Sequence, residues 1–337
     1  MEKIQKNNFS NKFSNKFSNK FSNKNSNKNS NKNSNKNSNK NSKNFSQKIS
    51  MQNFDITNFE KFNAFRWQHL LNQINGNFVE ITDQHINKIK LTDLHFIEQQ
   101  KQIIVQNTMQ FLYGFPANNV LLTGSRGCGK SSLVHALLNE FAAQNLRFVE
   151  IDKNDLGDLP IVIQILSKAK NNLRFIIFCD DLSFDADDNR YKALKSLLDG
   201  SMAMPPENIL IYATSNHRHL MPDYFSDNDA VQKDTNYYSQ NDEIHRNETV
   251  DEKISLSDRF GIWLPFYNFD QSEFLGIVNY WLNFYNIEKA IIEDEQTILS
   301  ALQWSTQRGS RSGRTAKQFA KDFAGKYLLA KKLQTQK

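Results

Sequence analysis

The stretch that decides the fold reads Val120-Leu121-Leu122-Thr123-Gly124-Ser125-Arg126-Gly127-Cys128-Gly129-Lys130-Ser131. Its last eight residues match the spacing G-x-x-x-x-G-K-[ST]. Glycines at these places allow the backbone to turn its N–H groups inward around phosphate oxygens. An apolar run precedes the loop and apolar residues at helical spacing follow it. The stretch predicts a strand, a phosphate-binding loop and a helix whose positive end faces the phosphates. The alternative is a glycine-rich turn without a ligand.

Within this loop the residue types suggest separate tasks. Lys130 is expected to reach the terminal phosphates, and the Ser131 hydroxyl is expected to bind Mg²⁺. A redox role for Cys128 is weighed against a small residue that fills the loop, and the second is preferred. The predicted nucleotide contacts are Gly124, Ser125, Arg126, Gly127, Cys128, Gly129, Lys130, Ser131 and Ser132.

A second apolar run, Phe175–Cys179, ends in two carboxylates, Asp180 and Asp181. Asp180 is expected to hold the Mg²⁺ ion through water, and Asp181 to orient or deprotonate an attacking water. The alternative is a strand that ends in a solvated acidic turn. A third run, Ile209–Ala213, leads to Asn216, which we expect to contact the γ-phosphate or the water. The alternative is that Thr214-Ser215-Asn216 simply forms a turn.

Arginines follow in two places. Arg259 precedes the last apolar run and is a candidate to enter a neighbouring subunit's site, where its charge would stabilise the transition state. The alternative is a pair between Arg259 and an acid of the same chain. Arg311 and Arg314 lie among glycines before a helical stretch. One of them, Arg311 in preference to Arg314, is expected to contact the γ-phosphate, and the alternative is a basic surface loop.

The order of the apolar runs predicts an α/β fold. The runs lie at 120–122, 148–151, 175–179, 209–213 and 262–264, and helical stretches separate most of them. Short continuous apolar strands alternating with helices are typical of a parallel sheet covered on both faces. Residues 223–255 are polar and are expected to form a long loop. After Asp270 the pattern is helical: Asp270 and Glu273 have capping-box spacing, and another helix is expected from Thr315 to Leu333.

The charge is divided unevenly along the 337 residues. The net charge is +6, but residues 1–50 hold 12 lysines and one acid, so the remainder has 30 basic and 35 acidic residues. Residues 9–42 repeat a unit of Asn, Ser and Lys, and are predicted to be disordered. The basic balance belongs to this tail, so it is no argument that the folded part binds nucleic acid.

Some classes of protein are excluded by composition. Two cysteines, Cys128 and Cys179, rule out a disulfide framework or a cysteine-rich zinc site. No apolar run approaches the roughly 20 residues that span a bilayer, so the sequence does not predict an integral membrane protein, and a cytoplasmic location is expected. The expected organisation is a tail at 1–50, a helical linker at 51–115, a nucleotide-binding α/β domain at 116–268 and a helical lid at 269–337.

Together these motifs resemble the AAA+ superfamily of P-loop ATPases. Gly124–Ser131 resembles Walker A, Phe175–Asp181 Walker B, Asn216 sensor 1, Arg259 the arginine finger, and Arg311 or Arg314 sensor 2. Further stretches, among them Asn118–Leu122, Tyr191–Lys195 and Lys253–Gly261, resemble an uncharacterised bacterial family, domain of unknown function 815. The resemblance covers residues 55–330. It implies a five-stranded parallel sheet in a three-layer sandwich, a helical lid, binding of ATP with Mg²⁺, and assembly into a homo-oligomer.

Two departures qualify this resemblance. Asp181 stands where the superfamily usually has Glu, so the water would be held less well and turnover would be slower. At Asn154–Asp158 there is no aromatic pore loop of the kind that threads polypeptide. No Asn-Lys-x-Asp guanine reader follows the strands, so ATP is expected rather than GTP.

Three functional hypotheses remain. The favoured one is an ATPase that remodels or regulates an unknown protein client. The second is a nucleotide-gated switch or scaffold with negligible turnover. The third is a loader-type ATPase that acts on nucleic acid, suggested by the basic tail and opposed by the acidic remainder.

Overall fold

The structure is a computed structural model of the chain. It describes residues 54–69, 76–170, 172–184, 190–199, 206–217, 220 and 255–335. The predicted disordered tail at 1–50 lies outside these residues, and so does nearly all of the predicted loop at 223–255. Residues Ser50–Lys337 form one compact unit.

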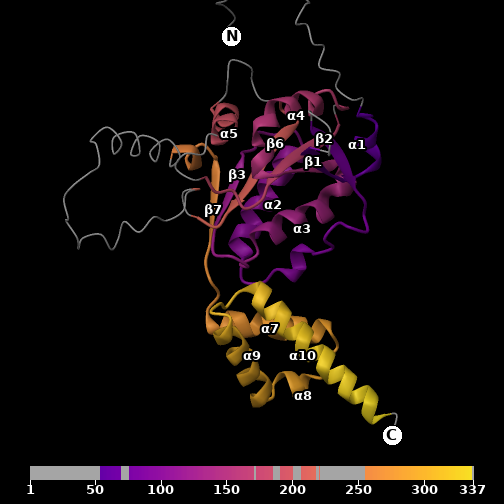
Figure 1. The fold of residues 1–337 in the computed structure, drawn as a ribbon, viewed down its shortest axis with the longest axis vertical. Helices are drawn as coiled ribbons and strands as arrows, with labels where there is room; N and C mark the ends of the chain where they lie inside the picture. Colours follow the sequence, from indigo (N-terminus) through magenta and orange to yellow (C-terminus); the bar gives the residue numbers. More distant parts are fainter. Residues whose placement is uncertain are drawn as a thin grey trace, which may run out of the picture. The chain divides into compact units, whose positions relative to one another are not determined.

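The centre of this unit is a seven-stranded sheet with the order β2-β1-β4-β5-β6-β3-β7 (Figure 1). All neighbouring strands are parallel except β1 and β2, which pair antiparallel. The strands are β1 Ala64–His69, β2 Gly76–Ile81, β3 Val120–Gly124, β4 Leu146–Ile151, β5 Arg174–Cys179, β6 Ile209–Ser215 and β7 Ile262–Phe266.

The five predicted apolar runs are confirmed as the strands β3 to β7. The strand that leads to the phosphate loop, β3, lies between β6 and β7, and β5 lies on the other side of β6. The carboxyl ends of β3, β5 and β6 therefore meet at one edge of the sheet, where ligands of parallel sheets bind. The predicted number of strands was wrong, because the sheet has two further strands, β1 and β2.

These two strands come from the segment 51–115, which the sequence predicted as a helical linker. Its ends are helical, at α1 (Asn58–Lys61) and α2 (Glu98–Leu112). Between these helices, β1 runs parallel to β4 with Ala64 opposite Phe148, and β2 pairs with β1. In β1 the side chains of Phe65 and Trp67 are buried while Arg66 between them is exposed. This alternation is short, and its parallel partner lies some 80 residues along the chain, so the pairing could not be read locally.

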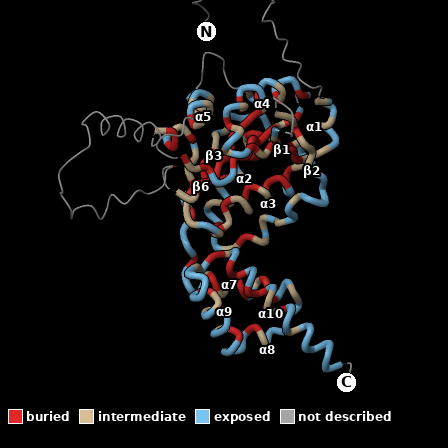
Figure 2. The backbone as a smooth tube through the Cα atoms, viewed as in Figure 1, coloured by how far each residue is buried: buried red, intermediate tan, exposed pale blue. Residues whose placement is uncertain are grey.

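Helices cover both faces of the sheet and form the predicted three-layer sandwich. Successive strand residues point to opposite faces. Val120 and Leu122 pack in one core with residues of α2 and α3, whereas Leu121 between them packs in a second core with residues of α4 and α5. Figure 2 shows these strands buried between the helices. The helices of this part are α1 Asn58–Lys61, α2 Glu98–Leu112, α3 Lys130–Phe141, α4 Leu159–Leu166 and α5 Tyr191–Leu198, with short 3-10 turns at Leu91–Asp93 (η1), Ala142–Gln144 (η2) and Lys153–Asp158 (η3).

Four helices follow β7, namely α7 Gln271–Phe284, α8 Lys289–Ile292, α9 Glu295–Gln307 and α10 Gly313–Gln334 (Figure 1). The predicted capping box is confirmed at the start of α7, where Asp270 accepts from the amide of Glu273 and the Glu273 carboxylate accepts from the amide of Asp270. α7 and α10 pack on each other through buried residues such as Phe274 and Phe319. In the part of the chain that the structure describes, no helix combines the length and the apolar character needed to cross a membrane.

Candidate functional site

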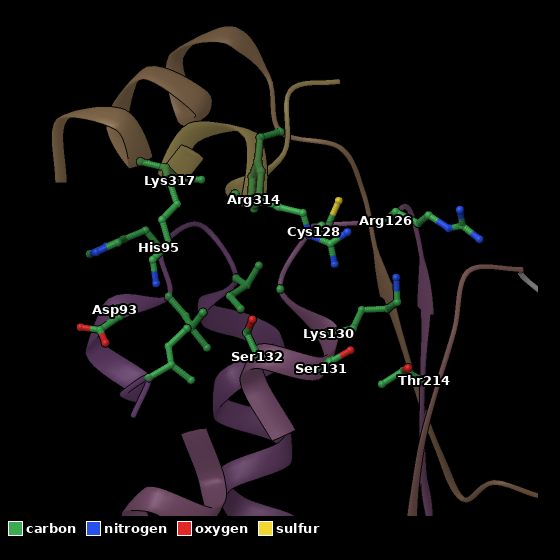
Figure 3. A pocket seen from close by; sticks show the side chains of 18 of the residues that line it. Asp93, His95, Arg126, Cys128, Lys130, Ser131, Ser132, Thr214, Arg314 and Lys317 are labelled. Atoms are coloured by element: carbon green, nitrogen blue, oxygen red, sulfur yellow. The ribbon is translucent and has the colours of Figure 1, made fainter. Parts of the chain in front are cut away.

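A cavity of about 490 Å³ opens at the carboxyl ends of β3, β5 and β6. Three parts of the chain line it: the phosphate loop with the strand ends, the segment 87–97, and the helices α7 and α10. Figure 3 shows Lys130, Ser131 and Thr214 at one end, and His95 and Lys317 at the other. Most of the site residues predicted from the sequence line this cavity, namely Arg126, Gly127, Cys128, Gly129, Lys130, Ser131, Ser132, Asp180, Asp181, Asn216 and Arg314.

The phosphate loop has the backbone that its sequence predicts. Gly124 ends β3 with φ +126°, Gly127 has φ +79°, and α3 begins at Lys130. A Cβ atom on Gly124 would lie 1.8 Å from the backbone oxygen of Phe266 on β7. Gly124 is therefore required twice, by its positive φ and by the close approach of the neighbouring strand.

Lys130 is almost fully buried, at 6% exposure, and all three of its amine protons have acceptors. Nζ donates to the backbone oxygens of Gly124 at 2.6 Å and Ser125 at 2.8 Å, and to Oδ1 of Asn216 at 3.1 Å. Gly124 and Ser125 were predicted to contact the nucleotide, but they do not line the cavity, and their backbone oxygens accept from Lys130. Burial lowers the pKa of the Lys130 amine, and the nearby Cys128 and the two aspartates oppose that shift.

Asp180 lies directly beside Ser131, as the sequence predicted for a pair that holds a metal ion. Ser131 Oγ donates to Asp180 Oδ1 at 2.6 Å, and Thr214 Oγ1 donates to the same oxygen at 2.5 Å. A hydroxyl and a carboxylate are hard oxygen donors, the type that Mg²⁺ takes when substrate phosphates supply further ligands. Within the described ranges no cluster of three or more His, Cys, Asp and Glu is placed to hold a metal ion. The donor set therefore fits Mg²⁺ carried in with a phosphate ligand and does not fit a cage built by the protein alone.

Asp181 and Asn216 are also brought together. Asn216 Nδ2 donates to Asp181 Oδ1, and the Oδ1 of the same Asn216 accepts from Lys130. Asn216 thus lies between the lysine and the second carboxylate, at the position where the predicted contact with a γ-phosphate or a water would be made.

The predicted arginines are found in three different settings. Arg314 lines the cavity, and its amide donates to the backbone oxygen of Gly127 at 3.3 Å. Arg311 is not among the lining residues, so the structure favours Arg314 where the sequence preferred Arg311. Arg259 is outside the cavity as well. It pairs with Asp199 and donates to the backbone oxygen of Ser255, which is the intrachain arrangement weighed as the alternative.

Cys128 is 1% exposed, and burial raises the pKa of its thiol. A thiol with a raised pKa is a poor nucleophile. The structure supports the expectation that this residue fills space in the loop. Cys179, at the end of β5, is also buried, and burial raises its pKa to about 12.

The far end of the cavity was not predicted. Its walls combine apolar side chains with two polar ones: Ile89 and Ile97 come from the segment before α2, Ile277 and Trp281 come from α7, and His95 and Lys317 lie beside them. The Lys317 amine lies 4.0 Å from the centre of a Trp281 ring. Ile277 and Trp281 are buried residues of α7, and nothing in the sequence indicated that this helix also closes a cavity.

The segment Asp93–Phe96 fastens this end to α7. Tyr280 Oη donates to Asp93 Oδ1 at 2.5 Å, and the rings of Tyr280 and His95 lie 4.2 Å apart. Phe96 has a positive φ of +62° and lies against Gly276, where a Cβ atom would come within 2.6 Å of its ring. The α7 wall of the cavity is therefore joined by three side chains to the wall that precedes α2.

Comparison with known proteins gives one family. The family model described as "Protein of unknown function (DUF815)" matches residues 60–327. A search of curated proteins gives no match. Among solved structures, a mutant of Thermotoga maritima RuvB aligns with a TM-score of 0.47 and 14% identity, covering 72% of this chain and 67% of that one. The Thermotoga maritima RuvB Holliday junction branch migration motor aligns with a TM-score of 0.37 and 14% identity, covering 69% and 71%.

Proposed function

We propose that this chain, which belongs to the DUF815 family, is an Mg²⁺-dependent ATPase with an AAA+ type of P-loop fold. One observation carries the proposal. Lys130 and Ser131 after β3, Asp180 and Asp181 after β5, and Asn216 after β6 converge on one cavity from three strands. This set combines a cation for phosphates, oxygen donors for a metal ion, and a base beside an amide, as phosphoryl transfer requires.

At the phosphate end, the chain supplies positive charge and amides. Gly127 and Gly129 turn the loop backbone, and the N-terminus of α3 directs its free N–H groups and partial positive charge toward the loop. Lys130 must exchange its bonds with Gly124, Ser125 and Asn216 for bonds with phosphate oxygens. Its low exposure favours that exchange, because a buried ammonium gains more from an anion than an exposed one does.

Ser131 and Asp180 would hold the Mg²⁺ ion, which when bound neutralises charge on the phosphates. Asp181 is the base. Its carboxylate orients a water and takes a proton from it as the water oxygen forms a bond to the γ-phosphorus. The bond from that phosphorus to the β–γ bridging oxygen breaks, leaving ADP and phosphate. Asn216, bonded to Asp181, is placed to orient the same water or a γ-phosphate oxygen.

The apolar end supports a nucleotide over a bare phosphate ligand. Ile89, Ile97, Ile277 and Trp281 line this end together with His95 and Lys317. Apolar walls with a few polar groups suit a flat base with polar edges. The sequence contains no guanine reader, so ATP is the proposed substrate. The helical segment 269–337, joined to the α/β domain 116–268, is the proposed lid that responds to ATP through Arg314.

Assembly completes the proposal. In the isolated chain Arg259 pairs with Asp199 and lies outside the cavity, so its proposed role is toward the site of a neighbouring copy in a homo-oligomer. Hydrolysis would then change the contacts between copies and act on a protein client. No contact in the described part of the chain identifies that client.

The test measures phosphate release from ATP by the full chain with and without Mg²⁺. Wild type is expected to release phosphate only with Mg²⁺. Lys130→Ala is expected to lose binding, and Asp181→Asn to bind ATP but lose turnover by about a hundredfold or more. Mg²⁺-dependent release that survives both substitutions unchanged would refute the proposal. If the proposal holds, proteins that co-purify with the Asp181→Asn variant in the presence of ATP would identify the client.

A second candidate is a switch that binds ATP without turning it over. Asp181 favours it, because an aspartate reaches less far than the glutamate usual in this superfamily. Tight ATP binding with no hydrolysis, at concentrations that favour oligomers, would select this function. The nucleic-acid loader rests on the basic tail, which lies outside the described residues.

A further inference from the structure

Thr214, the residue before the end of β6, contacts each of three consecutive residues in the acidic loop. Its hydroxyl donates to Asp180 Oδ1 at 2.5 Å and accepts from the amide of Asp181 at 2.9 Å. Its backbone oxygen accepts from the amide of Leu182 at 2.7 Å. Thr214 is 1% exposed, so these bonds lie in a region of low dielectric, where hydrogen bonds are strong.

The contact with Asp181 has a conformational reason. Asp181 has φ +53°, a left-handed backbone that residues with a side chain adopt rarely and only where neighbouring contacts hold it. Its amide is turned toward β6, where the Thr214 hydroxyl is its acceptor. Removing that oxygen would leave the amide without this partner and would remove a side-chain contact that holds this backbone.

The contact with Asp180 has an electrostatic reason. A threonine hydroxyl has a single proton, and here that proton is given to the carboxylate oxygen that also accepts from Ser131. Ser131 and Thr214 both donate to Asp180 Oδ1, but only Thr214 also accepts from the amide of Asp181 among these two residues. The Thr214 hydroxyl thus joins both acidic residues, and its action on the site runs through the carboxylates.

We propose that Thr214 is a positioning residue that sets both carboxylates of the site, Asp180 for the metal ion and Asp181 for the water. The inference rests on the proposed function and deepens it. When a residue that hydrogen-bonds and orients a metal ligand is replaced, metal affinity typically falls by about 10- to 100-fold. A hydroxyl that only filled space would be replaced by a methyl group without such an effect.

The experiment compares wild type with Thr214→Val, which keeps the shape and removes the hydroxyl, and Thr214→Ser, which keeps the hydroxyl. Thr123→Val is the matched control: Thr123 lies on the neighbouring β3, is 2% exposed, and its hydroxyl accepts from Trp263 and contacts neither carboxylate. The first measurement is the free Mg²⁺ concentration that half-saturates binding of ATP. It is expected to rise about tenfold in Thr214→Val. It should stay near the wild-type value in Thr214→Ser and Thr123→Val.

The second measurement needs no nucleotide. Amide hydrogen exchange in the free chain should become faster at Asp181 in Thr214→Val, because that amide loses its acceptor. Exchange at Leu182 should stay slow, because its acceptor is the backbone oxygen of residue 214. Thr214→Ser should protect both amides.

The outcomes separate the two proposals. If wild type binds ATP with Mg²⁺, and Thr214→Val needs no more Mg²⁺ than wild type, the inference is wrong even where exchange at Asp181 increases. If Thr214→Ser behaves like Thr214→Val, the hydroxyl is not the cause and the inference is also wrong. If wild type binds no nucleotide at any Mg²⁺ concentration, the proposed function fails and the inference fails with it.

Discussion

Lys130 and Asn216 are joined by a hydrogen bond of 3.1 Å between Nζ and Oδ1, although 86 residues separate them in the chain. The same Asn216 donates to Asp181, so a single amide connects the phosphate lysine to the proposed base. In this structure Lys130 also bonds the oxygens of its own loop. In the proposed function, ATP would displace these internal bonds of the lysine, and Asn216 lies between the two groups proposed to act on the γ-phosphate.

The first prediction concerns this amide. Asn216→Ala should bind ATP within a few-fold of wild type, because Gly124 and Ser125 still position Lys130. Hydrolysis should fall by about a hundredfold, the usual cost of one donor lost from a preorganised site. Binding is measured by titration and turnover by phosphate release. Unchanged turnover would show that Asn216 takes no part in hydrolysis.

The second prediction compares two glycines. Gly124→Ala should lower the free energy of unfolding by more than about 3 kcal/mol, because its Cβ would overlap the backbone of Phe266 and its φ is +126°. Gly325→Ala, in the middle of α10 with open space around it, should raise that free energy by about 0.5–1 kcal/mol. Denaturant unfolding of both variants checks the pair, and equal effects would contradict the close approach of β3 and β7.

The third prediction tests the role of Arg259 between copies. Arg259→Ala should bind ATP normally and hydrolyse it about a thousandfold more slowly. Mixing it with Lys130→Ala, which is also inactive, should recover part of the activity, since one chain then supplies the arginine and the other the phosphate site. Arg308→Ala is the control, because Arg308 stacks on Trp304 and does not line the cavity. If the mixture co-assembles and remains inactive, Arg259 serves only its pair with Asp199.

The fourth prediction concerns alkaline pH. Tyr212 accepts from Asn107 and, because Thr108 Oγ1 donates to Ile104, gives its own proton to Thr108. Burial raises the pKa of Tyr212 to about 12, and the hydrogen bond that it accepts from Asn107 partly opposes the shift. The folded chain thus keeps a proton that the unfolded chain loses near pH 10. Stability from this group is complete below pH 10 and should fall between pH 10 and 12, by up to about 1.4 kcal/mol per pH unit.

Urea unfolding across this range checks the sign. Tyr212→Phe should be less stable at pH 8, because Asn107 and Thr108 lose a partner, but its stability should decline less steeply above pH 10. Tyr113→Phe is the control, because that ring is 67% exposed. An equally steep decline in Tyr212→Phe would contradict the prediction.

The phosphate loop, both acidic residues and Asn216 were predictable from sequence because each follows directly from a strand that the sequence marks. An apolar run before Gly124, another before Asp180 and a third before Asn216 place all three at the carboxyl edge of a parallel sheet. The capping box at Asp270 was predictable for the same reason, since both partners lie within one turn. The preference for Arg311 over Arg314 was not supported, because only Arg314 lines the cavity. The two arginines are three positions apart around the start of α10, and the sequence does not show which of their side chains faces the cavity.

Other features depend on contacts between distant segments. The strands β1 and β2 extend the sheet because β1 pairs with the edge of β4, which lies far along the chain. Thr214 reads as one polar residue in a turn until the fold brings Asp180 and Asp181 against its hydroxyl. The apolar end of the cavity exists only where the segment 87–97 meets α7.

By itself the sequence determined the strands β3 to β7, the phosphate loop and the chemical types at their ends, because backbone conformation and strand periodicity are local properties. The tertiary structure alone decided which arginine lines the cavity, how Lys130 is held, and what fixes the two carboxylates. Those are distances between residues far apart in the chain, and they are set by packing on both faces of the sheet.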